Sequence, residues 1–410
     1  MNSNRVYILG GAQTDFARNW AREGLDIFDM FSEVLQVGLQ QCALDPADIE
    51  VGHVGNFVGE LFAGQGHMGG FFGHVDPAMS GMPASRHEAA CASGSMAILA
   101  AMAEIEAQRY GTACVLGIEL MRNVPGDAAA ENLRPAGWNG REAEDTPFVW
   151  PSLFSDLTDE YERRYGMDAK HLAAISELNF ANAKNNPNSQ TRRWQFNDSS
   201  FANDDEANPP VIGRIRKHDC GQITDGAAVL FLAGASKAEA YAKQRGMALE
   251  DIPYIKGWGH RTAPMLAARK LTESAAESHI YPHVRRAFLD AYQRAGISGI
   301  EEVDGMETHD CFSITEYMAL DHSGLTAAGE SWKAVEEGVI SREGKLPVNA
   351  SGGLIGLGHP VGATGVRMAL DCYKQVTNQA GDYQISGARN MLTYNVGGSA
   401  TTSASLVIGR

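Results

Sequence analysis

The sequence has no run of apolar residues long enough to cross a lipid bilayer. A membrane-spanning helix needs about 18 consecutive apolar residues, and the best candidates here are interrupted by Glu104 and Lys237. The first nine residues also lack the basic stretch and the long apolar stretch of a secretory signal. Because Ile408-Gly409-Arg410 is not a peroxisomal Ser-Lys-Leu address, we expect a cytoplasmic location and no membrane span.

Positive charge is scarce in this chain. The 34 Lys and Arg residues stand against 50 Asp and Glu residues, which gives a formal net charge of -16. This balance opposes nonspecific attraction to a phosphate backbone or to an anionic membrane surface. We therefore expect no nucleic acid among the partners, although a local group of cations could still hold a small anionic ligand.

Paired cysteines are also absent. The six cysteines show no Cys-x-x-Cys spacing, which argues against a zinc site or a disulfide framework. We expect no bound metal and a reducing compartment. Four of the cysteines are interpreted as buried packing residues, because free cysteine is among the most buried residue types; these are Cys42, Cys114, Cys220 and Cys372.

Strand and helix patterns alternate along most of the chain. The 410 residues, 44% of them hydrophobic, fit a globular protein of two to three domains. A strand is predicted over 5–10, an amphipathic helix over 27–44, an Ala-rich helix over 92–109 and a strand over 113–118. This alternation predicts the α/β class, with a parallel or mixed sheet covered by helices.

The pattern changes between about residues 125 and 218, where Trp, Pro, Asn and charged residues accumulate. We interpret this part as an inserted, loop-rich region with one clear helix over 168–184. The alternation resumes with a strand over 227–233, and a second, similar unit starts near residue 278. The simplest account is two similar α/β halves with an insertion in the first.

Cys91 is predicted to lie at the start of the Ala-rich helix. Unpaired backbone amides and the helix dipole at such a position favour a thiolate, so we expect a lowered pKa and a reactive sulfur. The small residues around Cys91 permit close approach by a substrate or by another segment of backbone. The alternative is an ordinary buried cysteine at a helix start.

His359 lies in the glycine-rich run 349–365. Because glycine-rich loops cost backbone entropy, such a run usually marks close approach of backbone to another group. Pro360 suits the first position of a helix, which would place His359 at a helix entrance. The alternative is a simple turn with a solvated histidine.

Two further segments carry reactive or exposed groups. The run His309-Asp310-Cys311-Phe312 follows a predicted strand that ends near Met306, and strand ends in α/β sheets collect catalytic groups. The segment 395–400 joins the two closing strands with small residues, and it either exposes backbone amides or forms a plain hairpin.

Taken together and in order, these segments resemble the thiolase family, and the match runs nearly end to end. Cys91-Ala92-Ser93 looks like the family's nucleophile motif, and Gly358-His359-Pro360 looks like its histidine motif. The opening strand over 6–14 and the segment Asp225-Gly226-Ala227-Ala228, where the first core domain resumes, also match. Each motif is weak by itself, but the ordered set is highly specific.

The chain departs from the commonest thiolase pattern at two places. It has His309-Asp310-Cys311-Phe312 in place of Asn-Glu-Ala-Phe, and Asn395-Val396-Gly397 in place of Cys-x-Gly. The loss of one cysteine and the gain of another resembles the sterol carrier protein type of thiolase, as do the loop-region segments 165–166 and 185–190. Because the chain ends where the thiolase core would end, we expect no fused sterol-carrier domain.

The resemblance implies a thiolase fold, in which two similar α/β core domains form αβαβα layers and carry an inserted loop domain. The implied boundaries are 1–124 and 220–270 for the two parts of the N-terminal core, 125–219 for the loop domain and 271–410 for the C-terminal core. The resemblance also implies a homodimer or a homotetramer.

The resemblance further implies a role for each site residue. Cys91 would be the nucleophile that carries the acyl group, and His359 would be its base and a donor to the thioester oxygen. Cys311 would be the acid/base at the α-carbon, and His309 would help to polarise the second thioester carbonyl. The amides of Cys91 and Gly397 would form the oxyanion hole. Asn395 stands at the lost cysteine's position, where it cannot transfer a proton.

The function implied is that of an acyl-CoA C-acyltransferase, which cleaves 3-oxoacyl-CoA with CoA or condenses two acyl-CoA molecules. Coenzyme A is then a substrate and product, and we expect no permanently bound cofactor. One alternative is a retro-aldol lyase that acts on a hydroxyacyl-CoA with a partner protein and needs no acyl-enzyme. Another is a noncatalytic acyl-CoA binding subunit. The cations available for the nucleotide end of CoA are Arg192, Arg193, Arg214, Arg216 and Lys217.

Overall fold

The computed structural model describes residues 5–410, and residues 1–4 of the predicted first core segment lie outside it. Its main element is a nine-stranded sheet. In sheet order the strands are β3 (Ala84–His87), β2 (Val51–Gly55), β4 (Thr112–Glu119), β7 (Gly226–Gly234), β1 (Val6–Gln13), β8 (Tyr254–Thr262), β11 (Thr402–Gly409), β10 (Asn390–Gly397) and β9 (Gly305–Thr308).

The sheet consists of two halves with the same internal order. In the first half β2 pairs parallel with β3 and β4, and β7 pairs antiparallel with β4 and β1. In the second half β10 pairs parallel with β9, and β11 pairs antiparallel with β10 and β8. A parallel bridge from Val348 to Met306 occupies the place that β3 has in the first half. The halves meet where Tyr7 of β1 pairs with Tyr254 of β8.

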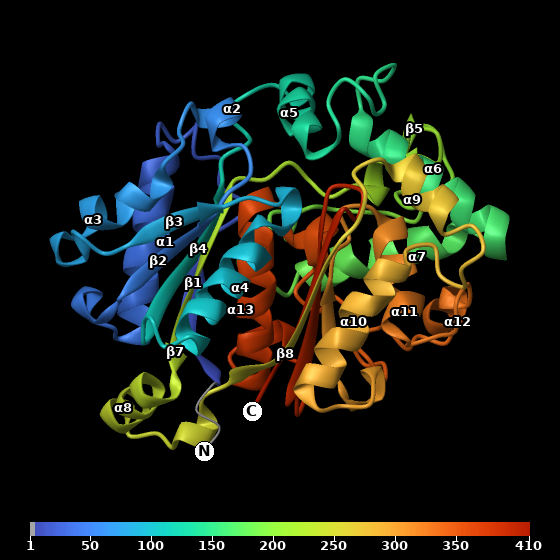
Figure 1. The fold of residues 1–410 in the computed structure, drawn as a ribbon. Coiled ribbons are helices and arrows are strands. Elements are labelled where there is room, and N and C mark those ends of the chain that lie inside the picture. Colours follow the sequence, from blue (N-terminus) through green and yellow to red (C-terminus); the bar gives the residue numbers. More distant parts are fainter. Residues whose placement is uncertain (1–4) are drawn as a thin grey trace.

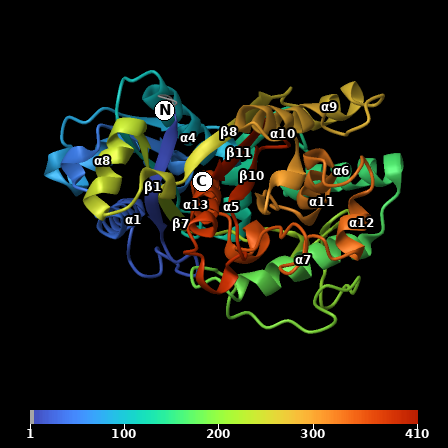
Figure 2. The ribbon, with the colours of Figure 1, turned by 90° about the horizontal axis from the view of Figure 1, so that it is seen from below.

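Helices separate and cover these halves. Helices α4 (Ser93–Glu106) and α13 (Thr364–Val376) contact each other between the two halves, as Figure 1 shows. Helix α1 (Ile27–Cys42) packs on β1 and β7 on the far side of the first half, and α10 (Pro282–Ala295) packs on β8 and β11 in the second. Seen from below, these outer helices flank the central pair (Figure 2). The predicted αβαβα layers are therefore present.

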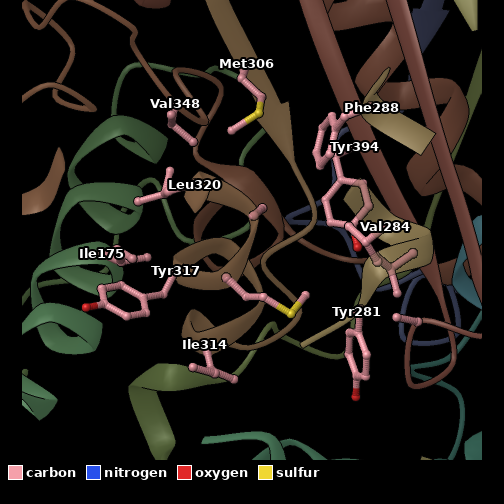
Figure 3. Packing of buried hydrophobic residues seen from close by; sticks show 14 of the residues in the cluster. Ile175, Tyr281, Val284, Phe288, Met306, Ile314, Tyr317, Leu320, Val348 and Tyr394 are labelled. Atoms are coloured by element: carbon pink, nitrogen blue, oxygen red, sulfur yellow. The ribbon is translucent and has the colours of Figure 1, made fainter. Parts of the chain in front are cut away.

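The hydrophobic core follows these layers. The central cluster joins Ile98 of α4 to Val366 of α13 and to strand residues such as Leu230. A second cluster lies between α1 and the first half. The largest lies in the second half, where Phe288 and Tyr394 pack together (Figure 3). Each large apolar side chain buried in this way contributes roughly 1.5–3 kcal/mol to the free energy of unfolding.

The inserted region contains more helix than predicted. Helix α7 (Ala169–Ala183) is the predicted one, and the Asp168 side chain caps it. Helix α6 (Val149–Tyr165) was not predicted, because the charged residues on its exposed side obscure the spacing of Leu153, Leu157 and Tyr161, which it buries. Helix α5 (Gly126–Leu133) and the short ribbon of β5 (Pro210–Ile212) and β6 (Ile215–Arg216) complete the region. The exact domain boundaries stay a prediction.

The second half also holds an unpredicted helix, α11 (Ser313–Ser323), in which every residue is buried, so that its sequence shows no polar face. The remaining helices are α2 (Gly59–Ala63), α3 (Phe71–Val75), α8 (Ala235–Arg245), α9 (Ala267–Glu273) and α12 (Ser331–Glu336). Within residues 5–410, each helix falls short of the length or the apolar character that crossing a bilayer demands.

Candidate active site

Cys91 lies in a tight turn between β3 and α4. The turn spans Ala90–Ala92, and Ala90 has the left-handed φ of 51°, which costs a residue with a Cβ atom roughly 1–2 kcal/mol. The Ser93 hydroxyl stabilises this turn, since it accepts a hydrogen bond from the Ala89 amide (2.9 Å) and donates one to the Ala90 carbonyl (2.6 Å). The turn places Cys91 near His309 and His359 of the second half.

His359 is held by two threonines. Its backbone amide donates to Oγ1 of Thr224 (2.9 Å), and its Nδ1 lies 2.7 Å from Oγ1 of Thr364. We assign the single hydrogen of the Thr364 hydroxyl to the Pro360 carbonyl oxygen (3.0 Å), which leaves Oγ1 to accept from His359. This assignment puts the proton of His359 on Nδ1 and leaves Nε2 free to accept a proton.

The sequence predicted that Pro360 occupies the first position of a helix, and this prediction is wrong. A turn over Val361–Ala363 follows it, and α13 begins only at Thr364. The close approach expected of the glycine-rich run is present. A Cβ atom added to Gly362 would lie 2.5 Å from the Ile118 carbonyl oxygen, so the loop can cross the end of β4 only with glycine here.

The structure brings the predicted side chains together. Sγ of Cys91, one ring nitrogen of His309 and one of His359 all lie within 4.8 Å of one another. The two imidazole rings meet edge to face with centroids 5.2 Å apart. Cys311 lines the same cavity as Cys91 and His359, and its Sγ lies 3.8 Å from the Thr315 hydroxyl. Nucleophile, base and acid/base candidates thus share one site.

The cavity in front of these groups has a volume of about 230 Å³ and is largely apolar. Helices α5 and α6 of the inserted region form one wall of it, which includes Leu133, Trp150 and Phe154. Cys220 lines the cavity as well, so its interpretation as a packing residue is incomplete. His309 is not among the lining residues; it is buried behind them.

Burial dominates the electrostatics of the site. It raises the pKa of Cys91 to about 12, helped by the charges of Glu119 and Glu88, while hydrogen bonds from the backbone of Gly398 and of Cys91 itself act in the opposite direction. The predicted lowering of this pKa is therefore wrong, because loss of solvation outweighs the helix start. Burial also lowers the pKa of His359 to about 3. Both groups are neutral at rest, so Cys91 needs a base.

Hydrogen bonding from the backbone of Gly398, next to the predicted Gly397, lowers the pKa of Cys91, as does that from the backbone of Cys91 itself. Gly397 itself lies against the nucleophile turn. A Cβ atom added there would be only 2.2 Å from the Ala89 carbonyl oxygen. The oxyanion role of the Cys91 and Gly397 amides stays a prediction.

The motif analysis gave no role to two buried acids. Glu119, at the end of β4, accepts hydrogen bonds from the amides of Phe57 (2.9 Å), Val58 (3.2 Å) and Gly362 (3.0 Å), and so ties β2 and β4 to the loop that follows His359. Asp310 accepts from the amides of Leu354 and Ile355 and so ties the His309 segment to the glycine-rich run. The sequence signal for both was an acid beside a strand end.

Most of the candidate cations already have partners. Arg192 pairs with Asp15 at 2.8 Å, Arg214 with Glu162 at 2.5 Å and Arg216 with Asp205 at 2.9 Å. Arg193 and Lys217 form no ion pair with any residue that the structure describes.

The fold and the site define an α/β enzyme of two equivalent halves, with a cysteine and two histidines at their junction. Family models match most of the chain: "Thiolase, N-terminal domain" over residues 6–198 and "Thiolase C-terminal domain-like" over residues 267–410. The acetyl-CoA acetyltransferase of Methanothermobacter thermautotrophicus is 30% identical over 413 residues, which cover 99% of each chain. The chain belongs to the thiolase family and is an acyltransferase, as the resemblance implied.

A further sequence relative and two solved structures extend the comparison. Human sterol carrier protein 2 is 27% identical over 412 residues, which cover 96% of this chain and 70% of that protein. Among solved structures, the Ltp2-ChsH2(DUF35) aldolase matches with a TM-score of 0.77 at 17% identity, over 100% of this chain and 98% of that one. Human mitochondrial 3-ketoacyl-CoA thiolase matches with a TM-score of 0.69 at 14% identity, over 100% and 99%. The predicted thiolase fold is confirmed.

Proposed function

We propose that the protein is an acyl-CoA C-acyltransferase that works through an acyl group on Cys91. The observation that carries this proposal is that Sγ of Cys91 and a ring nitrogen of His359 lie within 4.8 Å of each other. With its proton assigned to Nδ1, this histidine offers Nε2 as a base. Acetyl-CoA acetyltransferase relatives at up to 30% identity support the same activity. The reaction is the cleavage of a 3-oxoacyl-CoA with CoA, or the reverse condensation.

In the first half-reaction His359 takes the proton of the Cys91 thiol. The thiolate attacks the acyl carbonyl, and the negative charge that develops on its oxygen is stabilised by the amides of Cys91 and Gly397, with Gly398 close by. The intermediate then collapses to a thioester on Cys91. In condensation the leaving group is the thiolate of CoA, which takes the proton from His359.

In the second half-reaction the Cys311 thiol first gives its proton to His359, which is neutral again once CoA has left, and the resulting thiolate removes a proton from the α-carbon of a second acyl-CoA. The carbanion attacks the Cys91 thioester, a carbon–carbon bond forms, and Cys91 leaves as a thiolate that takes the proton from His359. Burial holds the pKa of the Cys311 thiol well above its ordinary value, so that the thiolate, once formed, is a strong base for this step. Thiolysis runs the same steps in reverse.

The acyl group would lie in the apolar cavity between the core and helices α5 and α6. Arg193 and Lys217 are our candidates for the phosphates of CoA, since neither is neutralised by an ion pair within residues 5–410. We also propose a homodimer or homotetramer, which sedimentation analysis of the purified protein tests directly.

The decisive experiment is to incubate the protein with acetyl-CoA or a longer acyl-CoA, digest it and weigh the peptides. We expect an acyl adduct on the Cys91 peptide that a His359→Ala variant forms far more slowly. The Cys220 peptide of the same digest is an internal control, because this thiol lines the same cavity but hydrogen-bonds to the Arg216 carbonyl oxygen. Absence of an adduct on Cys91 with every acyl-CoA tried would refute the acyl-enzyme.

A lyase is the second candidate, favoured by the likeness to the Ltp2-ChsH2(DUF35) aldolase, which is named as a protein of two components. A lyase of this kind would cleave a hydroxyacyl-CoA without an adduct on Cys91. The gathering of Cys91, His359 and Cys311 in one site favours the transferase over the lyase and over a noncatalytic binding subunit. The same adduct experiment, run beside an assay for aldol cleavage, separates the three.

A further inference from the structure

Asn395 connects the nucleophile turn to His309 across the two halves of the sheet. It lies near the end of β10 and is completely buried. Its Nδ2 donates to the Cys91 carbonyl oxygen at 3.1 Å and lies 3.1 Å from Nδ1 of His309. Its Oδ1 accepts from the Ser95 hydroxyl at 2.7 Å. All hydrogen-bonding atoms of this side chain therefore have partners.

These contacts fix the orientation of the Asn395 amide. The Cys91 carbonyl oxygen can only accept, so the atom that faces it must be the amide nitrogen. That nitrogen has two hydrogens. One goes to Cys91, and the other is directed to Nδ1 of His309, which must then be an acceptor without a proton of its own.

Burial lowers the pKa of His309 well below its ordinary value, so the neutral ring carries one proton at neutral pH. With Nδ1 serving as an acceptor, that proton must be on Nε2. His359 has the opposite arrangement, because the Thr364 hydroxyl fixes its proton on Nδ1. The two rings, whose centroids lie 5.2 Å apart, thus present different groups: one a base and the other a donor.

We propose that Asn395 is a positioning residue that holds His309 in the Nε2–H form, so that His309 acts as a hydrogen-bond donor and never as a second base beside Cys91. A donor is what the carbonyl oxygen of a reacting thioester requires when negative charge develops on it. If His309 were instead a second base, it could take the Cys91 proton in place of His359. The proton would then not be on His359, which returns it to the leaving thiolate. The consequence for turnover rests on the proposed function, but the proton position does not.

The first test is spectroscopic and uses the unmodified protein. Histidine labelled with ¹⁵N is incorporated, and a His309→Gln variant identifies which of the 12 histidines gives the His309 signals. Long-range ¹H–¹⁵N correlation spectra then report which ring nitrogen carries the proton. We expect Nε2–H. A wild-type spectrum with the proton on Nδ1 would overturn the proposal, whatever reaction the enzyme performs.

The second test replaces the amide donor by an acceptor of the same shape. In Asn395→Asp the carboxylate attracts a proton to Nδ1 of His309, so we expect the Nδ1 signal to become that of a protonated nitrogen. We expect kcat for condensation to fall roughly 10²-fold, as for the loss of one oxyanion donor, with KM nearly unchanged. Acylation of Cys91 should persist, because His359 and Thr364 are unaltered.

The matched control is Asn390→Asp at the other end of the same strand. There Oδ1 accepts from Lys256 at 2.8 Å, and Nδ2 donates to the Glu302 carbonyl oxygen, far from Cys91. This variant should keep the His309 spectrum and the turnover rate of the wild type. If Asn395→Asp folds and keeps both as well, Asn395 does not set the proton position. If wild-type Cys91 is never acylated, the proposed function fails while the spectroscopic result stands.

Discussion

The two halves of the sheet share one topology but carry different chemistry at equivalent places. Helix α4 packs on strand β4, and helix α13 packs on strand β10. These two helices also pack against each other. The turn before α4 carries Cys91, whereas the loop before α13 carries His359. Because the two helix starts meet, the proposed nucleophile Cys91 from one half reaches the proposed base His359 from the other. The repeated fold supplies the meeting point, and the difference between the two copies supplies the side chains of the proposed reaction.

The halves also differ in how they bury charge. In the first half His53 of β2 contacts Glu104 of α4 at 3.1 Å, and the Glu104 side chain is 28% exposed. In the second half Glu307 of β9 contacts Arg367 of α13 at 2.8 Å, and both side chains are completely buried. Equivalent strands and helices thus hold a pair with one partly exposed partner in the first half and a completely buried pair in the second. Desolvated pairs are costly to break, so the second half should be the more sensitive.

The largest effects are expected from substitutions of Cys91 and His359, the side chains that distinguish the starts of helices α4 and α13. Cys91→Ala should lower kcat/KM at least about 10⁴-fold, or about 5 kcal/mol, because the acyl group then has no carrier. His359→Ala should cost about 10³-fold, because solvent can still take the thiol proton slowly. Steady-state kinetics with circular dichroism as a folding check measures both. If His359→Ala is the more damaging, the assignment of nucleophile and base is wrong.

The buried ion pair of the second half comes next. Arg367→Met should reduce the free energy of unfolding by about 3–5 kcal/mol, because it leaves the buried carboxylates of Glu307 and Asp371 without their cation. Lys374→Met on the same helix is the matched control. Its contact with Asp371 is longer, at 3.5 Å, and partly exposed, so its loss should cost less than about 1 kcal/mol. Equal losses in urea unfolding would contradict the comparison.

The buried acids of the second half predict a pH dependence. Burial raises the pKa of Glu316 to about 8, of Glu307 to about 7 and of Asp310 to about 6, whereas unfolded carboxyl groups titrate near pH 4. Between about pH 4 and 8 the folded state binds more protons, so the stability that these acids contribute falls as the pH rises through this window. Thermal unfolding should show this decline, and Glu316→Gln should flatten it. An unchanged slope would show that Glu316 does not titrate here.

The smallest effect is expected in the first half. Burial lowers the pKa of His53, so the ring is neutral and its contact with Glu104 is a hydrogen bond between a neutral and a charged group. His53→Gln keeps a donor for Glu104 and should cost about 1 kcal/mol in urea unfolding. A loss as large as that of Arg367→Met would show that the two halves are equally sensitive.

Local pattern predicted most of the fold. Helix α4 was expected over 92–109 and spans Ser93–Glu106, since an apolar run rich in Ala favours a helix in any surroundings. Strand β3 was missed because only one of its four residues, Ala84, is apolar, and all four are at least partly exposed at the edge of the sheet. Helix α11 was missed for the opposite reason, because burial on every side removes the periodicity that reveals a helix.

The motifs likewise predicted which side chains form the site, but not the groups that hold them. Asn395 and Cys91 are 304 residues apart in the chain, and Glu119 and Gly362 are 243 apart. Contacts over such separations leave no spacing that can be read along the chain. The motifs and their order along the chain could be read from the sequence. The sequence did not predict the hydrogen bonds that hold the loops of these motifs together.

The sequence by itself determined the α/β repeat, the candidate cysteines and histidines of the site, and the family. The tertiary structure decided the protonation of these groups. A helix start alone favours a Cys91 thiolate, but burial raises its pKa to about 12, since desolvation depends on every segment that packs around the sulfur. The proton positions on His309 and His359 depend in the same way on Asn395 and Thr364. Residue type sets what a group can do, and its folded surroundings set which protonation state it has.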